Sequence, residues 1–256
     1  MTALPTLCRV LILLPPSEGK TAPARGRPLE LRSLSFPSLT DTRSRVLDAV
    51  AEASHRADAP TVLGVSAGLI AEVARNTSLR TAPTAPAGAV YSGVLYDALG
   101  LDTLDAPARR RAARRVVVVS ALFGALRLGD RIPAYRLSMS VNLPGVGPLA
   151  TAWRGPLASA LAPAAGGLVV DCRSSTYAAA WAPPPALAAR WVHVAVPGAT
   201  HAAKHTRGLV TRALCLHGGS PRTPAQLAAA LKGSFHVELT APARPGRPWI
   251  LSATAH

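Results

Sequence analysis

The chain has 256 residues, with 28 lysine or arginine and 13 aspartate or glutamate residues, so its formal net charge at pH 7 is +15. No apolar run approaches the roughly 18 residues that a membrane span requires. The three cysteines form no CxxC pair, which argues against a disulfide framework or a zinc knuckle. The N-terminus also lacks a signal-peptide pattern. We therefore expect a cytoplasmic protein with no membrane partner, no metal and no cofactor.

The positive charge has two interpretations. It predicts affinity for nucleic acid or for phosphorylated ligands, or it reflects a genome whose base composition favours Ala, Arg, Pro and Gly codons. Only three of the basic residues are lysines, namely Lys20, Lys204 and Lys232. In a chain that otherwise uses arginine, a lysine is a candidate for a chemical role.

Buried strands alternate with helices along the chain. Continuous apolar runs predict buried strands, and capping residues predict helices. Strands are expected from Val10 to Leu14 and at residues 62–65, 116–119, 167–172 and 191–196, with a C-terminal hairpin of residues 235–240 and 249–252. Helices are expected at residues 41–57, from Asp105-Ala106-Pro107 to Arg115, from Thr200 to Cys215, and from Thr223-Pro224 to Gly233. Residues 22–40 and 80–90 are expected to be loops.

This alternation indicates an α/β fold, and the final hairpin indicates a mixed rather than a purely parallel sheet. With no repeat and no long linker, residues 1–256 are expected to form a single domain in which helices flank the sheet.

Four of the predicted strands end in polar clusters. If these strands are parallel, the clusters share one edge of the sheet, where open α/β folds bind ligands. The alternative is that strands commonly end in solvated polar loops. The clusters are Ser17, Glu18 and Lys20; Ser120; Asp171, Arg173, Ser174, Ser175 and Tyr177; and Pro197-Gly198 with His201, Lys204, Arg207 and Arg212. Glu18 and Asp171 are the best carboxylates for acid–base work, and Lys20 and Lys204 are candidates to hold an anion.

Two further segments each have a functional and a structural explanation. His201, Lys204 and Gly208 share a helix face, which either binds an anion or is an ordinary basic surface. Gly208 would allow either another backbone or a ligand to approach closely. Tyr91 and Tyr96 flank a glycine. Their functional explanation is stacking on a base or donating to an anion, and their structural explanation is packing in the core. Arg127, Tyr135 and Arg136 follow the strand that ends at Ser120. The sequence lacks Walker, GxGxxG, HExxH and GxSxG motifs.

In order along the chain stand LLPPSEGKT, YSGVLY, SALFGALRLGDRIPAYRL, DCRSSTY and HAAKHTRGLVTR. This ordered set resembles the YaaA family of peroxide-stress proteins over about residues 9–240. The resemblance implies a cytoplasmic α/β protein that contains a helix-hairpin-helix-like element. One bacterial member is linked to limiting iron and DNA damage under hydrogen peroxide, and DNA binding has been ascribed to it.

The resemblance also implies a set of residues that line a cleft. They are Ser17, Lys20, Tyr91, Ser120, Arg127, Tyr135, Arg136, Ser174, Tyr177, Lys204 and Arg207. Ala202 stands where the family commonly has a bulky aromatic, and Ser138 stands where an acidic residue is common. Both changes enlarge or neutralise one side of the expected cleft, which leaves room for a different ligand.

Two functional hypotheses follow. The first is a stress protein whose cationic surface or cleft binds DNA or a phosphorylated ligand. The second is a specialised enzyme that acts on a nucleoside, nucleotide or other small anionic metabolite, with Lys20 or Lys204 holding its anionic group. The oligomeric state is not predicted by either hypothesis.

Overall fold

A seven-stranded sheet forms the centre of the protein in the computed structural model, which describes residues 10–196 and 200–255. Its strand order is β10-β11-β9-β8-β1-β3-β4. The five inner strands pair in parallel, and only the two edge strands, β4 and β10, are antiparallel to their neighbours. The expected mixed α/β sheet flanked by helices is confirmed. The sheet strands are β1 (Val10–Leu14), β3 (Val116–Ser120), β4 (Gly124–Leu126), β8 (Leu168–Asp171), β9 (Trp191–Ala195), β10 (Phe235–Thr240) and β11 (Trp249–Ala255).

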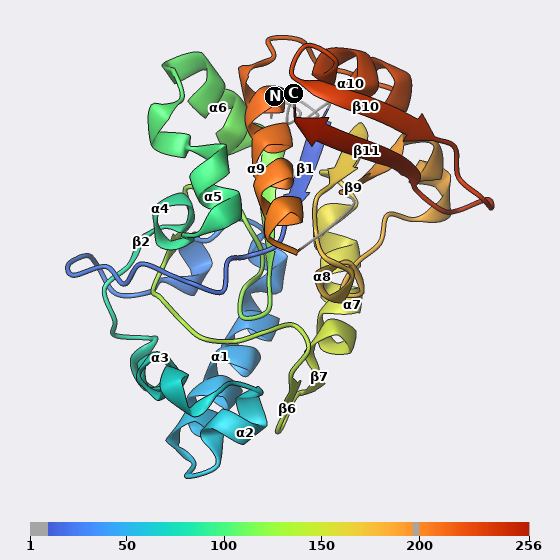
Figure 1. Ribbon diagram of the computed structural model, residues 1–256. Coiled ribbons are helices and arrows are strands. Elements are labelled where there is room, and N and C mark those ends of the chain that lie inside the picture. The colour runs from blue at the N-terminus through green and yellow to red at the C-terminus, as the bar shows by residue number, and fades with distance from the viewer. Residues whose placement is uncertain (1–9, 197–199, 256) are drawn as a thin grey trace, which may run out of the picture.

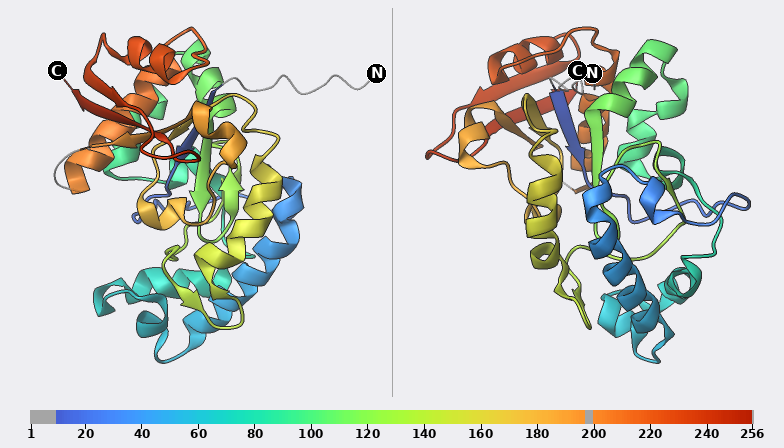
Figure 2. Two further views of the ribbon diagram at one scale, coloured as in Figure 1. Left: turned by 90° about the vertical axis from the view of Figure 1, so that its right-hand side faces the viewer. Right: turned by 180° about the vertical axis from the view of Figure 1, so that it is seen from behind.

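Helices cover both faces of this sheet. Figures 1 and 2 show α9 across one face, beside α5 and α6, with α7 and α1 on the other. The short helices α2 and α3 and the hairpin β6–β7 form a lobe toward which β1 and β3 point. The helices are α1 (Thr40–His55), α2 (Ala59–Leu63), α3 (Ile70–Ala74), α4 (Ala87–Val90), α5 (Val94–Leu99), α6 (Ala106–Arg115), α7 (Leu149–Leu161), α8 (Ser175–Ala178), α9 (Thr200–Leu216) and α10 (Pro224–Leu231). Short strands β2 (Ala85–Pro86), β5 (Arg131–Ile132), β6 (Asn142–Leu143) and β7 (Gly147–Pro148) form two small ribbons.

The central strand β1 is buried along its whole length. It lies between β3 and β8, and helices cover both faces of the sheet, so every side chain of the strand lies in the core. Pro15 and Pro16 follow it and end the ladder, because proline has no N–H to donate. The parallel pairing places the carboxyl ends of β1, β3, β8 and β9 on one edge, as expected.

Several sequence predictions need correction. Residues 62–65 are not a strand: Pro60 in the first turn and Gly64, whose φ of 64° closes the end, make residues 59–63 the helix α2. The helix predicted at residues 41–57 is α1, which spans Thr40–His55. The predicted loop at 80–90 contains β2 and α4. The caps Asp105 and Thr223 are confirmed, each accepting a backbone N–H.

Gly208 is explained by helix packing. A Cβ at this position would lie 2.2 Å from the Leu95 carbonyl oxygen and 2.8 Å from the Ala98 Cβ, because α9 crosses α5 closely there. Of the two alternatives for this glycine, the structure supports the approach of another backbone.

Gly208→Ala is therefore expected to destabilise the protein by about 2 kcal/mol or more, since a well-packed interface has no room for the added methyl. Gly68→Ala is the matched control: Gly68 also lies in a helical turn (residues 67–69), is exposed, and a Cβ there meets nothing within 4 Å. That change should be neutral or stabilising by up to about 1 kcal/mol. Denaturant unfolding of both variants measures the difference, and equal stabilities would contradict this explanation of Gly208.

Candidate functional site

The loop after β1 is fastened to the segment that contains Tyr91 and Tyr96. Lys20 forms a β-bridge with Tyr91, and the Thr21 N–H donates to the Val90 carbonyl (2.9 Å). Ser17 Oγ accepts the Ser92 N–H at 3.1 Å, and the Tyr96 hydroxyl donates to the Pro15 carbonyl at 2.8 Å. Two motifs about 75 residues apart along the chain therefore form one wall of a site at the carboxyl edge of the sheet.

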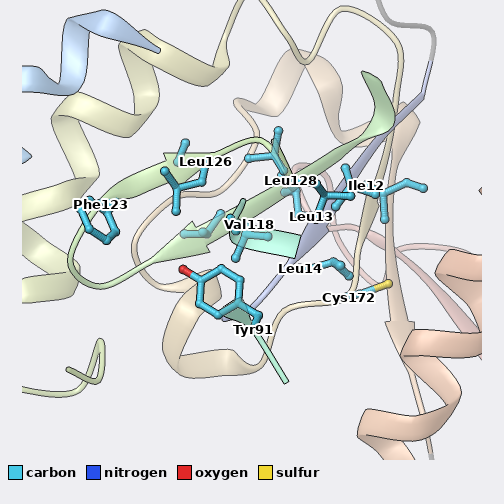
Figure 3. Packing of buried hydrophobic residues seen from close by; sticks show 14 of the residues in the cluster. Ile12, Leu13, Leu14, Tyr91, Val118, Phe123, Leu126, Leu128 and Cys172 are labelled. Atoms are coloured by element: carbon cyan, nitrogen blue, oxygen red, sulfur yellow. The ribbon is translucent and has the colours of Figure 1, made fainter. Parts of the chain in front are cut away.

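All four tyrosines of the chain converge on this wall. The Tyr91 and Tyr96 ring centres lie 5.3 Å apart, and Tyr135 meets Tyr91 edge to face at 6.5 Å. Tyr177 is close enough to Tyr91, Tyr96 and Tyr135 to interact with each electrostatically. Figure 3 shows Tyr91 beside Leu14 and Val118, with its hydroxyl directed toward the side of Phe123. Burial raises the pKa of every one of these phenols, that of Tyr177 to about 12, so all four stay protonated near neutral pH.

Lys20 is half-buried against these rings. Its Nζ lies 4.2 Å from the Tyr135 ring centre and 5.7 Å from that of Tyr91. The same nitrogen donates to the carbonyl oxygens of Ser17 (2.7 Å) and Glu18 (3.3 Å). Burial, and after it the nearby Arg136 guanidinium, lowers the pKa of Lys20 from 10.5 to about 7. The amine is therefore available in both protonation states at physiological pH.

Arg136 holds the two carboxylates nearest to Lys20. Its guanidinium lies 3.3 Å from Glu72 and 3.7 Å from Glu18, whose side chain is 78% exposed. Asn76 fixes the Arg136 backbone through bonds to both its N–H and its carbonyl. The arrangement places a permanent positive charge at the mouth of the site and an exposed carboxylate beside it.

Asp171 is not available for acid–base work. Its side chain is fully buried and forms a two-pronged ion pair with Arg173, at 2.7 and 2.8 Å. Burial alone would raise the pKa of Asp171, but the Arg173 charge and its hydrogen bonds hold that pKa below 3.8. Arg173 also donates to the carbonyls of Tyr177 and Trp181, so the pair fixes the helix that carries Tyr177.

Arg127 lies away from the other predicted site residues. Because β4 runs antiparallel to β3, Arg127 is at the amino edge of the sheet, where it donates to the carbonyls of Arg114 and Val116. The prediction that Arg127 lies with the other ligand-binding residues is therefore corrected by the structure.

The remaining predicted residues divide into supporting and exposed groups. Ser120 is buried and bonds to the Tyr135 hydroxyl, Arg207 donates to the Val194 carbonyl and fastens α9 to β9, and Ser174 precedes α8. His201 and Lys204 are exposed on the first turns of α9. The Pro197-Gly198 part of the fourth cluster, the Thr200 side chain and Cys8 lie outside the described residues. The sequence analysis missed Glu72 and Asn76, because two polar residues four positions apart are common and give no distinctive signal.

Tyr91, Ser92 and Tyr96 also border a groove of about 1230 Å³. Its far side is formed by α6, including Arg109, and by Arg212 of α9. Within residues 10–196 and 200–255, no helix is long and apolar enough to cross a membrane, and no group of three or more His, Cys, Asp or Glu side chains could hold a metal ion.

The two described cysteines are buried thiols. Burial raises the pKa of Cys172 to about 12 and that of Cys215 to about 11. Because the thiolate is the reactive form, we expect both to resist iodoacetamide in the native protein at pH 7 and to react on unfolding. Peptide mass spectrometry of a Cys8→Ser variant measures this, and rapid native alkylation would contradict it.

The fold defines a class: an α/β protein with lysine, arginine and tyrosine side chains gathered at the carboxyl edge of a largely parallel sheet. The family profile described as "Peroxide stress protein YaaA" matches residues 10–239. The chain is 51% identical to a UPF0246 protein of Streptomyces coelicolor over 257 residues, which cover 96% of this chain and 99% of that one. It is 41% identical to a UPF0246 protein of Corynebacterium efficiens, over 88% of this chain and 93% of the relative. This protein belongs to the YaaA family of peroxide stress proteins.

Proposed function

We propose that this protein binds, and acts on, a small anionic, nucleotide-like metabolite at the Lys20 site as part of a cytoplasmic response to peroxide. The observation that carries the proposal is the convergence of Lys20, Arg136 and all four tyrosines at the carboxyl edge of the sheet. Tyr177, the partly exposed member of the four, gives a ring on which a planar group can stack, and Arg136 gives a fixed charge for a phosphate or carboxylate.

The alternative, binding of DNA through the cationic surface, has one specific support. Arg109 and Arg110 are exposed on α6, beside the groove that starts at Tyr91. Much of the remaining positive charge, however, serves the fold. Arg43, Arg111, Arg115, Arg127, Arg173, Arg207 and Arg212 all donate to backbone carbonyl oxygens. Net charge is therefore weaker support for a DNA partner than the Lys20 site is for a small ligand.

A thermal-shift screen tests the proposal. The panel contains inorganic phosphate, nucleotides, nucleosides, small carboxylates and duplex DNA, each at low and high salt. A ligand that binds only the folded state stabilises it, by about 2.7 kcal/mol at a concentration of 100 Kd. We expect one small anion to raise the Tm at both salt concentrations in the wild type.

The control is a matched pair of lysine variants. The shift should persist in Lys232→Met, whose lysine is exposed after α10, and disappear in Lys20→Met. A shift that survives Lys20→Met would contradict the proposed site. A shift with DNA alone, lost at high salt, would favour the alternative, since phosphate contacts weaken steeply with salt.

A further inference from the structure

The surroundings of Lys20 favour a reactive, neutral amine over a lysine whose role is only to carry positive charge. None of the described carboxylates forms an ion pair with Nζ, because Arg136 engages both Glu18 and Glu72. The carbonyl oxygens of Ser17 and Glu18 accept two N–H bonds from Nζ. Two is the number that a neutral amine has, so its lone pair is left for a reacting atom.

Two features that activate lysine nucleophiles occur together here. Such lysines are desolvated against apolar groups or lie next to another cation. Lys20 packs against the Tyr135 ring, and Arg136 is the neighbouring cation. The charged and titratable groups facing Nζ are Arg136, Glu18, Glu72 and the phenols of Tyr91 and Tyr135. Burial and Arg136 dominate over the two carboxylates, because the pKa is lowered overall.

A hydrogen-bond chain fixes the two tyrosine rings that flank Lys20. Ser120 Oγ accepts the N–H groups of Leu122 (3.2 Å) and Phe123 (3.1 Å), which occupy both its lone pairs. Its own proton must therefore go to the Tyr135 hydroxyl, 2.7 Å away. The Tyr135 hydroxyl lies 3.0 Å from that of Tyr91, within hydrogen-bonding distance. Tyr91, Tyr135 and Ser120 are all buried, so these bonds hold in place the two rings that flank Lys20.

We infer that Lys20 is a nucleophile, and that the ligand of this site carries a carbonyl carbon with which Nζ forms an imine. The inference rests on the proposed function, since it names the reactive group of the same ligand. The amine lone pair attacks the carbonyl carbon, and a proton moves from nitrogen to oxygen to give the carbinolamine. The C–O bond then breaks, the oxygen takes a proton from solvent and leaves as water, and a protonated imine remains.

Reductive trapping tests the inference on the full chain. Glyoxylate, a small anionic aldehyde, is the probe, cyanoborohydride reduces any imine, and peptide mass spectrometry follows Lys20, Lys204 and Lys232 separately. An ordinary lysine is neutral at pH 7 in only about one molecule in a few thousand. We expect Lys20 to be modified roughly tenfold or more faster than Lys204 at pH 7. Equal or slower modification of Lys20 at that pH would overturn the inference.

The pH profile separates reactivity from access of the reagent. The rate at Lys20 should level off above about pH 8, whatever its absolute value, because the amine is then neutral. A rate that keeps rising beyond pH 10 would overturn the inference.

The two proposals fail in different ways. Fast trapping at Lys20 without any small-anion shift in the thermal screen would reject the proposed ligand and keep the nucleophile. A Lys20-dependent shift with slow trapping would keep the binding site and reject the imine.

Discussion

Lys20→Met is expected to make the protein more stable relative to the wild type at pH 7 than at pH 10. In the folded wild type the pKa of Lys20 is about 7, against 10.5 as the ordinary value. Between these pH values the unfolded chain binds a proton that the folded chain does not, so wild-type stability falls as the pH drops from 10.5 toward 7. Methionine removes this term and keeps the apolar stem.

The expected difference between the two curves is on the order of a few kcal/mol, because one pKa unit corresponds to about 1.4 kcal/mol. Urea unfolding at several pH values between 7 and 10 measures it. Titration of other groups is common to both proteins and cancels in the difference. Curves that run parallel over this interval would show that Lys20 is not desolvated in the folded state.

Asp171→Asn is expected to cost about 3–5 kcal/mol, because it leaves the buried Arg173 guanidinium without its counter-charge. The pKa of Asp171 is lowered in the folded state, so the wild-type pair contributes stability at neutral pH that is lost as the pH falls below about 4. The free energy of unfolding of the variant should therefore lack the decrease that protonation of Asp171 causes in the wild type.

Asp58→Asn is the matched control for Asp171. Its ion pair with Arg56 has similar geometry, at 2.8 Å, but both side chains are about half exposed, at 52% each. Exposed pairs contribute little, so no measurable change in the urea midpoint is expected. If the Asp171 and Asp58 variants proved equally stable, the buried pair would not have the structural role assigned to it.

Most of the sheet was predictable, because β1, β3 and β8 are continuous apolar runs that end at Pro, Gly or polar residues. Helices with side-chain caps, such as those starting after Asp105 and Thr223, were found for the same reason. The short edge strand β4 was not predicted. Helix α7 was not expected, because Gly155-Pro156 looks like a helix break although the helix continues through it. Residues 62–65 gave an apolar signal too short to separate strand from helix.

The site was predictable in part. Parallel strand ends predicted which loops would meet, and Lys20, Tyr91 and Tyr135 do meet. Which polar residues would serve the fold instead was not predictable, since Asp171 and Arg127 look like site residues until their buried partners are known. The desolvation of Lys20 was also invisible, because it depends on side chains brought together from distant segments.

The central claim is that Lys20 is a desolvated amine at the centre of the site. NMR titration of the lysine Cε resonances tests it most directly, since the chain has only three lysines and Lys20→Met assigns the signal. We predict that the Lys20 resonance titrates near pH 7. A Lys20 resonance that titrates above pH 9 would contradict the account, because the amine would then be an ordinary charged lysine.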